Sequence, residues 1–201
     1  MDEDRRTELG GARPPEAVEV DDALLLRRWR AGDAVDLAAA VVQARSHLRP
    51  WMPWVEAYDE DPVAAAAAFL PAIEAAWTDG TACAYGIWAG PTTTAAHPDA
   101  RRLVGAVGLE NRIGSAGLEV GYWLVPSATG RGLMTAAVRA LAAAALALPA
   151  VRRLEIHHDV ANARSGAVPA RLGWRRVHEL PRAVHASGES GRSVVWETGQ
   201  G

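Results

Sequence analysis

The sequence has few of the residues on which several kinds of site depend. Its 201 residues include a single cysteine, Cys83, which excludes an internal disulfide and any site built from several cysteines. Such cysteine usage suits a reducing cytoplasm. Lysine is absent as well, because all 21 residues counted as Lys or Arg are arginines. We attribute that bias to genome composition and do not interpret it as arginine-dependent recognition.

A strong net charge and a long apolar run are also lacking. The formal net charge is −3, whereas a dedicated nucleic-acid binder usually carries a basic stripe. The longest apolar run, residues 140–151, is too short to cross a bilayer, and no apolar signal region follows the charged residues 1–6. We therefore expect a cytoplasmic monomer or homodimer that binds neither a membrane nor nucleic acid directly.

The remaining composition is that of a single globular domain. A chain of 201 residues can bury a core of its own, and no internal repeat or second apolar pattern indicates a further domain. We predict one domain over residues 18–199. Residues 1–17, where Gly10, Gly11, Pro14 and Pro15 stand among charged residues, are predicted to form a disordered tail.

Apolar periodicity and turn residues predict the first half of the domain. Asp33 and Asp61 are expected to cap two helices, the second of which begins with Pro62. The expected elements are a strand within residues 18–29, helices over 33–47 and 61–77, strands over 82–89 and 103–110, and a flexible surface loop over 90–102.

Strands and helices alternate in the second half. The expected elements are strands over 118–126 and 151–158, helices over 133–148 and from Asn162 onward, and a final strand pair over 175–180 and 193–198. Two parallel strands joined through a helix should be neighbours in one sheet. Pro169, seven residues past Asn162, deletes a helical hydrogen bond and is expected to kink the last helix, which would shift Arg171 and Leu172.

A glycine-rich turn lies between the strand over 118–126 and the helix over 133–148. Gly130 and Gly132 flank Arg131, so the backbone can turn tightly while its N–H groups stay unobstructed. The helix N-terminus that follows adds unpaired N–H groups and a partial positive charge. Together these features favour a phosphate cradle, although a lone Gly-x-Gly more often only turns the chain.

These motifs resemble those of a known family. Residues 121–126, 130–135, 162–165 and 172–174 resemble, in order and spacing, the GNAT superfamily of acyl-CoA-dependent N-acetyltransferases. Residues 47–54 are similar to the Trp-Pro signature of the ribosomal-protein N-terminal acetyltransferases of the RimJ/RimL type. The resemblance covers residues 18–199. It implies an α+β or α/β fold with a mixed, mostly antiparallel twisted sheet, flanked by helices and with a splayed parallel strand pair at the cofactor site.

Two positions depart from the general pattern of the superfamily. Thr129 stands where Arg or Gln is usual, and Met134 stands where Gly or Ala is usual. Met134 is usual in the ribosomal-protein branch, so it supports the narrower resemblance. Thr129 removes one long side chain from the phosphate loop, and we expect little effect on binding because backbone donors dominate such sites.

The resemblance implies acetyl-CoA as the co-substrate and no metal. Pantetheine would lie between the splayed strands against the backbone of Leu124 and Val125, whose side chains can equally be plain core. Asn162 would contact the cofactor while capping its helix. Backbone groups would make the pyrophosphate contacts, and only Arg131 would also use its side chain. The residues concerned are Gly130, Arg131, Gly132, Leu133, Met134 and Thr135.

Acetyl transfer to an amine also needs a base and a proton donor for the leaving thiolate. The resemblance places Ser165 near the sulfur, where its hydroxyl could donate, although a serine in a first helical turn is often structurally idle. Glu119 is the leading candidate for the base, with a solvated edge carboxylate as the alternative. Glu110 and His157 are further candidates for the base.

The acceptor is expected to be a primary amine. Trp51 and Trp54, with Met52 between prolines, could wall an acceptor pocket or only pack a helix end. Neutralising an α-amino group at pH 7 costs about 1 kcal/mol, whereas neutralising a lysine costs roughly 4.6 kcal/mol, so a protein N-terminus is the easier acceptor. A small amine, such as an antibiotic or an aminoacyl nucleotide, and an inactive acyl-CoA-binding regulatory module are the alternatives.

Overall fold

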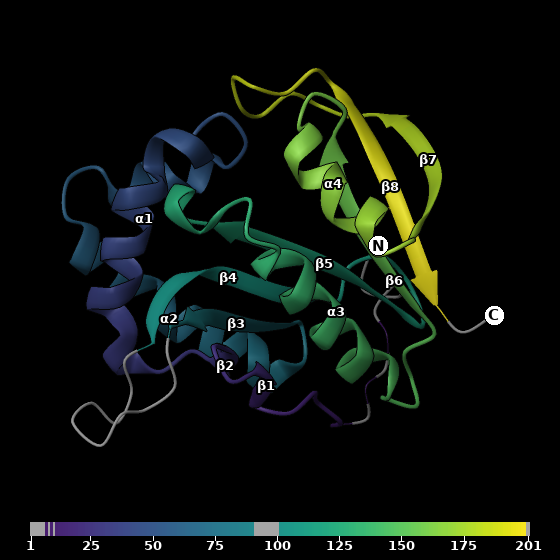
Figure 1. Cartoon of the computed structure of the whole chain (residues 1–201), viewed down its shortest axis with the longest axis horizontal. Helices are drawn as coiled ribbons and strands as arrows, with labels where there is room; N and C mark the ends of the chain where they lie inside the picture. The colour runs from purple at the N-terminus through teal and green to yellow at the C-terminus, as the bar shows by residue number, and fades with distance from the viewer. Residues whose placement is uncertain (1–6, 8, 10, 91–100, 200–201) are drawn as a thin grey trace.

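The computed structural model describes residues 7, 9, 11–90 and 101–199, and these form one sheet with helices on both faces (Figure 1). Eight strands follow one another across the sheet in the order β1-β2-β3-β4-β5-β6-β8-β7. The strands are β1 (Ala17–Asp21), β2 (Leu24–Arg28), β3 (Ala82–Ala89), β4 (Arg102–Glu110), β5 (Gly117–Leu124), β6 (Arg153–Asp159), β7 (Arg175–Pro181) and β8 (Arg192–Gly199). The helices are α1 (Ala34–Leu48), α2 (Pro62–Asp79), α3 (Leu133–Leu146) and α4 (Ala163–Arg171), with short 3-10 turns η2 (Ala31–Asp33), η3 (Pro53–Tyr58) and η4 (Pro126–Ala128).

The parallel pair β5 and β6 divides the sheet. Every other pair of neighbouring strands is antiparallel. The pairing of β5 with β6 consists of three residue pairs, Gly117 with Arg153, Leu118 with Leu154, and Glu119 with Glu155. Beyond Glu119 these two described strands pair no further, so they diverge toward the end at Leu124. The predicted mixed, mostly antiparallel sheet with a splayed parallel pair is therefore confirmed.

The helices cover opposite faces of the sheet, as two neighbouring residues of β5 show. The Tyr122 hydroxyl reaches α4, whereas the Trp123 ring contacts Trp54 of η3. Since successive strand residues point to opposite faces, α4 and η3 lie on different sides. Helix α3 packs beside α4, and η3 packs with α1 and α2.

Each helix buries an apolar stripe against the sheet. In α1 the stripe is Leu37, Val41, Ala44 and Leu48, and in α3 it is Ala137, Val138, Leu141 and Ala145. The Asp61 side chain accepts a hydrogen bond of 3.0 Å from the Ala64 N–H, which confirms the predicted cap of α2. Asp33 does occupy the N-cap position of α1, but its carboxylate binds Arg27 and the Arg30 N–H instead of capping the helix.

The first predicted strand is in fact a hairpin. Most of β1 and all of β2 lie within residues 18–29, because Asp21 ends β1 and its side chain accepts a 2.8 Å hydrogen bond from the Ala23 N–H. An aspartate that binds the backbone two residues further on stabilises a turn. The predicted surface loop over 90–102 falls mostly on residues 91–100, which lie outside the described residues.

Part of the segment predicted to be a disordered tail contacts the domain. The Thr7 N–H donates to Asn111 Oδ1 at 2.7 Å, and the Thr7 hydroxyl donates to the Gly117 carbonyl at 2.8 Å. Arg13 Nε donates to the Trp77 carbonyl at the end of α2. Residues 1–6, 8 and 10 lie outside the described residues, so for them the disordered tail stays a prediction.

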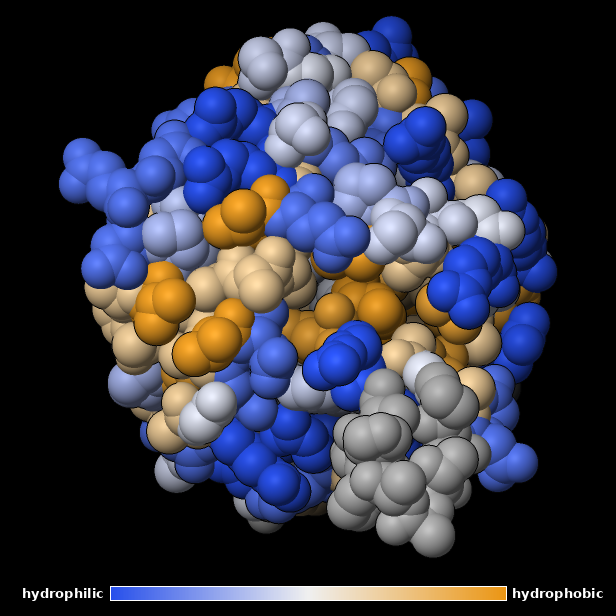
Figure 2. Space-filling model, turned by 60° about the vertical axis from the view of Figure 1, so that its left-hand side comes forward, coloured by the Kyte–Doolittle hydropathy of each residue, from blue (hydrophilic) through white to orange (hydrophobic). Residues whose placement is uncertain are grey.

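The side of the molecule that carries α1 and α2 mixes apolar and polar surface. Figure 2 shows apolar side chains gathered near the middle of this view, with hydrophilic side chains around them. The large apolar side chains that the two helices and η3 leave exposed are Val35, Val42, Trp54, Val63 and Phe69. No helix within residues 11–90 or 101–199 is both long enough and apolar enough to cross a membrane.

Candidate active site

A cavity of about 890 Å³ opens where β5 and β6 diverge. Its size is within the range of small-molecule and cofactor sites. The cavity is bounded by the end of α1, the end of β5, the glycine-rich turn, the first turn of α3 and helix α4. Its lining includes His47, Leu48, Trp51, Met52, Tyr122, Trp123, Leu124, Thr129, Gly130, Gly132, Leu133, Met134, Thr135, Asn162, Arg164, Ser165, Val168 and Arg171.

The N–H groups of the glycine-rich turn have no backbone acceptor within the part of the chain that the structure describes. Gly130 and Gly132 have φ angles of 73° and 77°, in the left-handed region that glycine adopts without strain. Gly132 is the N-cap of α3 and offers no side chain to the helix. Among the described residues no backbone carbonyl accepts from the N–H groups of Gly130, Arg131 or Gly132. The turn can therefore direct several donors at one anion.

At the end of β5, the two predicted contact residues, Leu124 and Val125, differ in their backbone hydrogen bonding. The Val125 N–H donates to the Val104 carbonyl at 2.8 Å, and the Val125 carbonyl accepts from Ala128, so both groups are already used. Antiparallel pairs alternate between bonded and non-bonded residues, so the backbone groups of Leu124 face away from β4 and toward the gap. The backbone of Leu124 is thus open toward the gap, whereas that of Val125 is bonded within the protein, and the predicted cofactor contacts at both residues stay predictions.

Helix α4 begins at the opposite wall of the cavity. Asn162 Oδ1 accepts a 3.2 Å hydrogen bond from the Ser165 N–H, which confirms Asn162 as the cap of α4. The Ser165 hydroxyl donates to Tyr122 Oη at 3.3 Å, across the gap between β5 and β6. Both side chains line the cavity. Burial raises the pKa of Tyr122 to about 12, so the phenol keeps its proton at neutral pH.

Pro169 does not end α4, which continues to Arg171. A proline has no N–H, so the helical bond that would end on the carbonyl four residues earlier, at Ser165, is missing. The Tyr122 hydroxyl donates to that carbonyl at 2.8 Å. Sequence reasoning missed this role of Tyr122, because the compensating donor comes from a strand 43 residues earlier in the chain.

Glu119, the leading candidate for the base, forms an ion pair. Its carboxylate accepts two bonds of 2.8 Å from Nε and Nη2 of Arg112, and its side chain is 11% exposed. Burial by itself would raise the pKa of Glu119, but the hydrogen bond and charge of Arg112, together with His157 and Arg182, lower the pKa overall. Glu119 does not line the cavity.

Glu110, a further candidate for the base, is paired with Glu119 across β4 and β5. The same arginine, Arg112, also bonds to Glu110. Here burial is the stronger influence, and it raises the pKa of Glu110 despite the Arg112 charge. Glu110 Oε1 lies 3.7 Å from the point where a Cβ of Gly121 would be, so this carboxylate extends along β5 toward Trp123.

His157, the third candidate for the base, is engaged on β6. Its Nε2 lies 2.6 Å from a Glu155 carboxylate oxygen, and its Nδ1 lies 4.0 Å from Glu119. Arg153 binds the other oxygen of Glu155 at 2.6 Å. None of these four residues lines the cavity. We therefore regard His157 as part of a charged network on the face of β5 and β6 opposite α4.

Aromatic residues form the remaining wall. Trp51 and Met52 line the cavity, whereas Trp54 does not. The Trp54 ring lies 6.0 Å from that of Tyr58 and 6.1 Å from that of Trp123, distances of direct aromatic contact. Trp54 thus packs η3 against the Trp123 ring of β5, and 41% of its surface is exposed.

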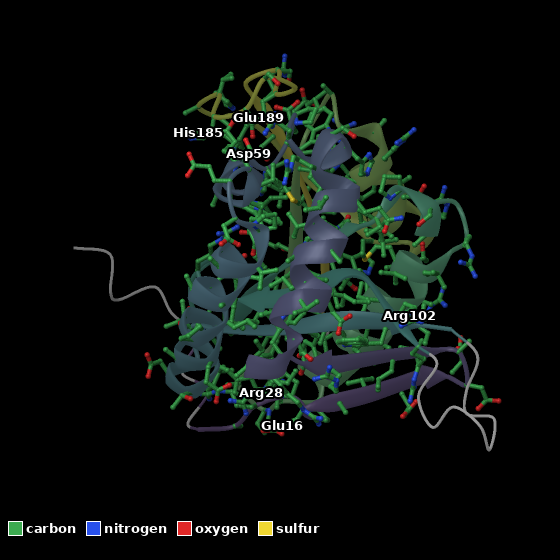
Figure 3. The ribbon with its side chains drawn as sticks, turned by 90° about the vertical axis from the view of Figure 1, so that its left-hand side faces the viewer. Glu16, Arg28, Asp59, Arg102, His185 and Glu189 are labelled. Atoms are coloured by element: carbon green, nitrogen blue, oxygen red, sulfur yellow. The ribbon has the colours of Figure 1, made fainter. Side chains whose placement is uncertain are left out.

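The connection between β7 and β8, residues 182–191, borders the same end of the molecule. The Gly188 N–H donates to the Pro50 carbonyl at 2.8 Å, and Ser190 binds the Asp159 carboxylate at the end of β6. Figure 3 shows His185 and Glu189 of this connection at the end of the molecule that also carries Asp59. These contacts join the end of β6 to the Trp-Pro segment, and no short-range signal in the sequence indicates them.

The comparisons with known proteins fit this geometry. Residues 23–175 match the family model described as acetyltransferase (GNAT) domain. The chain belongs to the GNAT acetyltransferase family. That membership confirms the predicted resemblance and the prediction of an acetyl-CoA-dependent N-acetyltransferase. A curated relative, "Putative ribosomal N-acetyltransferase YdaF" of Bacillus subtilis (strain 168), is 29% identical over 171 residues, which are 85% of this chain and 87% of the relative.

Solved structures share the fold of this GNAT chain. The microcin C7 self immunity acetyltransferase MccE, in complex with acetyl-CoA and AMP, has a TM-score of 0.80 at 20% identity, over 92% of this chain and 97% of that one. RimL, a ribosomal L7/L12 alpha-N-protein acetyltransferase in complex with coenzyme A, has a TM-score of 0.79 at 20% identity, over 92% and 98%. At these identities the likeness establishes the fold.

Proposed function

We propose that this protein transfers the acetyl group of acetyl-CoA to the N-terminal α-amino group of a protein, by direct attack within a ternary complex. The observation that carries the proposal is the pair of left-handed glycines, Gly130 and Gly132, whose turn directs free N–H groups into the cavity beside the diverging strands. A diphosphate fits the turn, and a narrow amide-bearing arm fits the gap that β5 and β6 leave open.

Acetyl-CoA would be held mainly by backbone groups. The N–H groups from Gly130 to Thr135 would bind the pyrophosphate, with support from the positive end of α3. Arg131 is exposed, so its guanidinium can reach the same phosphates from outside the turn. The backbone of Leu124 would bind a pantetheine amide in the manner of a further strand. Asn162, which also caps α4, lines the cavity where the arm would pass.

Ser165 would assist the departure of the thiolate. Its hydroxyl faces the gap from α4 and can donate a hydrogen bond to sulfur. Cys83 takes no part in this chemistry, since it is buried in β3 and its pKa is raised by burial to about 11. A protonated, inaccessible thiol is a poor nucleophile, so transfer would proceed without a covalent enzyme intermediate.

The base would come from the carboxylates that Arg112 holds together. We propose Glu110 as the group that accepts the proton, through water, because its pKa is raised and its side chain extends over Gly121 toward Trp123. Glu119, the base predicted from the sequence, would instead hold Arg112 in place through its two hydrogen bonds. Such a weak base is sufficient for an α-amino group, whose neutral form costs about 1 kcal/mol at pH 7.

The proposal of a protein N-terminus as the acceptor is supported by relatives named for ribosomal acetyl transfer. The structural neighbour that binds AMP suggests a nucleotide-bearing amine as the alternative. Here the Trp54 and Trp123 rings are in direct contact at 6.1 Å and tilted by 55°, which leaves no slot between them for a stacked base. This ring pair therefore lends no support to the nucleotide-bearing acceptor.

Thiol release with a panel of acceptors tests the proposal. Acetyl-CoA should first raise the melting temperature of the protein at concentrations well above its dissociation constant. Turnover is then expected with peptides that carry a free N-terminus and not with N-formyl controls of the same sequence. Turnover with small amines alone would show that the acceptor is a small amine and not a peptide. Tight binding of acetyl-CoA without turnover of any acceptor would identify a regulatory module. Because the enzyme has no lysine, its own side chains contribute no acetylated amine to the signal.

A further inference from the structure

Two hydroxyl groups meet where β5 and α4 face each other across the cavity. The Tyr122 hydroxyl donates to the Ser165 carbonyl at 2.8 Å, and the Ser165 hydroxyl donates to Tyr122 Oη at 3.3 Å. A phenol has a single hydrogen, and here the carbonyl accepts it. Tyr122 Oη is therefore the acceptor of the Ser165 hydrogen, which fixes the direction in which the Ser165 hydroxyl points.

The first of these bonds depends on Pro169. In an uninterrupted helix the N–H of residue 169 would donate to the Ser165 carbonyl, and Pro169 has no N–H. A partly buried carbonyl without a donor is unfavourable. The Tyr122 hydroxyl supplies the missing donor to the Ser165 carbonyl. The proline of α4 and the tyrosine of β5 thus form one arrangement, even though they belong to separate elements.

We propose that Tyr122 is the positioning residue of Ser165, and that Pro169 makes this possible by leaving the Ser165 carbonyl free for the tyrosine. The inference rests on the proposed function, in which Ser165 donates a hydrogen bond to the departing sulfur. Tyr122 holds the serine side chain in one rotamer at the cavity wall. When sulfur lies beside Ser165, the serine hydrogen rotates from Tyr122 Oη to sulfur, so the hydrogen bond to Tyr122 is exchanged for one to sulfur and the covalent O–H bond stays intact.

Burial supports the assignment of Tyr122 as an acceptor. Burial raises the pKa of Tyr122 to about 12, so its hydroxyl stays protonated at physiological pH. The Tyr122 hydroxyl donates its single hydrogen to the Ser165 carbonyl, so Tyr122 is not itself the donor to sulfur. Because Tyr122 fixes the position of Ser165 Oγ, only the serine hydrogen has to rotate to meet the charge that develops on sulfur.

A cycle of Tyr122→Phe, Ser165→Ala and the double variant tests the catalytic part. Tyr122→Phe is expected to lower kcat about tenfold and to change the dissociation constant of CoA less than twofold. In the Ser165→Ala background the same change should have almost no further effect on kcat, because the group that Tyr122 positions is gone. Multiplicative losses of kcat in the double variant would overturn the proposal.

A second cycle with Pro169→Ala tests the structural part without any activity measurement. Tyr122→Phe is expected to lower the melting temperature by about 3 °C, and clearly less in the Pro169→Ala background, where an N–H can bond to the Ser165 carbonyl. Equal shifts in both backgrounds would overturn the role of Pro169.

Tyr85→Phe is the matched control, because the Tyr85 hydroxyl also donates to a backbone carbonyl, that of Pro15 at 2.8 Å, but lies outside the cavity lining. It should lower the melting temperature similarly and leave kcat unchanged. A loss of kcat in Tyr85→Phe equal to that in Tyr122→Phe would show that Tyr122 acts only through stability. If the unaltered protein binds acetyl-CoA and acetylates no amine, the proposed function fails and the catalytic role of Tyr122 fails with it, whereas the melting-temperature cycle still reports on the carbonyl bond.

Discussion

The ring of His158 lies directly against the backbone of Gly166. A Cβ at residue 166 would be 2.7 Å from both Nε2 and Cε1 of His158. The ring cannot move aside, because Nε2 accepts from the Trp196 indole at 2.9 Å and Nδ1 bonds to the Asp159 carbonyl at 2.8 Å. Since indole is only a donor, the Nδ1 of His158 carries the hydrogen. This contact sets how closely α4, and with it Ser165, approaches β6.

Gly166→Ala should therefore destabilise the protein. Overpacking at a fixed contact costs about 1 to 3 kcal/mol, and the better helix propensity of alanine offsets about 1 kcal/mol of this. We expect a net loss of up to about 2 kcal/mol in the free energy of unfolding, measured by urea denaturation. Gly32→Ala is the matched control, since nothing lies within 4 Å of its added Cβ, and it should leave stability nearly unchanged. Equal stability of both variants would contradict the rigid contact.

Gly132→Ala should weaken CoA binding. The φ of Gly132 is 77°, a conformation that costs an alanine about 1 to 2 kcal/mol, and relief of that strain would turn the N–H groups of the loop away from the cavity. We expect the dissociation constant of CoA, measured by calorimetry, to rise about tenfold. Gly11→Ala carries a similar backbone cost, with φ at 84°, far from the loop in sequence and outside the cavity lining. It should lower stability and leave CoA affinity unaltered.

Glu110→Gln should slow acetyl transfer more than Glu119→Gln does. If Glu110 accepts the proton, its loss lowers kcat by about 100-fold. Glu119→Gln leaves Arg112 to pair with Glu110 alone, which would lower the pKa of Glu110 and move the acidic limb of the rate profile to lower pH. Rate profiles of both variants with one peptide acceptor provide the measurement. If Glu119→Gln lowers kcat more than Glu110→Gln does, Glu119 is the base and the assignment to Glu110 is wrong.

The contribution of Glu119 to stability should depend on pH. The pKa of Glu119 is lowered in the folded protein, so its contribution to stability is present above the pKa of the unfolded chain, about 4.3, and is lost as the pH falls through the lower folded value. Glu119→Gln is therefore expected to destabilise the protein at pH 7 and to destabilise it progressively less as the pH falls below the pKa of the unfolded chain, as compared by denaturant unfolding. A difference that persists in acid would mean that packing, and not charge, makes the contribution.

Cys83 should be unreactive in the folded protein. Its side chain is buried and its pKa is raised to about 11, so both access and thiolate are lacking at pH 8. An aromatic disulfide reagent should label one thiol per chain only after denaturation. Cys83→Ser is expected to retain kcat, although burial of a hydroxyl in β3 will lower stability. A loss of kcat without a loss of structure would bring the cysteine back into the mechanism.

The sequence predicts the elements of this fold well where the signal is local. Strand β3 begins and ends at the expected residues 82 and 89, and the caps at Asp61 and Asn162 are where the sequence places them. Local competition explains the error at residues 18–29, where Asp21 forms a turn inside an otherwise strand-like run. At Asp33, a nearby arginine replaces the helix as the partner of the carboxylate.

The candidate site is less predictable, because it depends on contacts between distant segments. The glycine loop and α4 carry local motifs, and both line the cavity as expected. Which of Leu124 and Val125 has backbone groups that are not bonded to β4 follows from the register of β5 on β4, which no local pattern reveals. The same is true of Arg112, which lies in the turn after β4 and determines how Glu110 and Glu119 differ in pKa.

The short pairing of β5 with β6 has a consequence for backbone protection. Only three residue pairs join the two halves of the sheet, and the amides of Tyr122 and Leu124 face the widening gap rather than β4. Such amides should exchange with deuterium within seconds, whereas the Val125 amide, bonded to Val104, should exchange far more slowly. A pantetheine chain laid along this edge would act as a missing strand, so the cofactor becomes an integral part of the sheet.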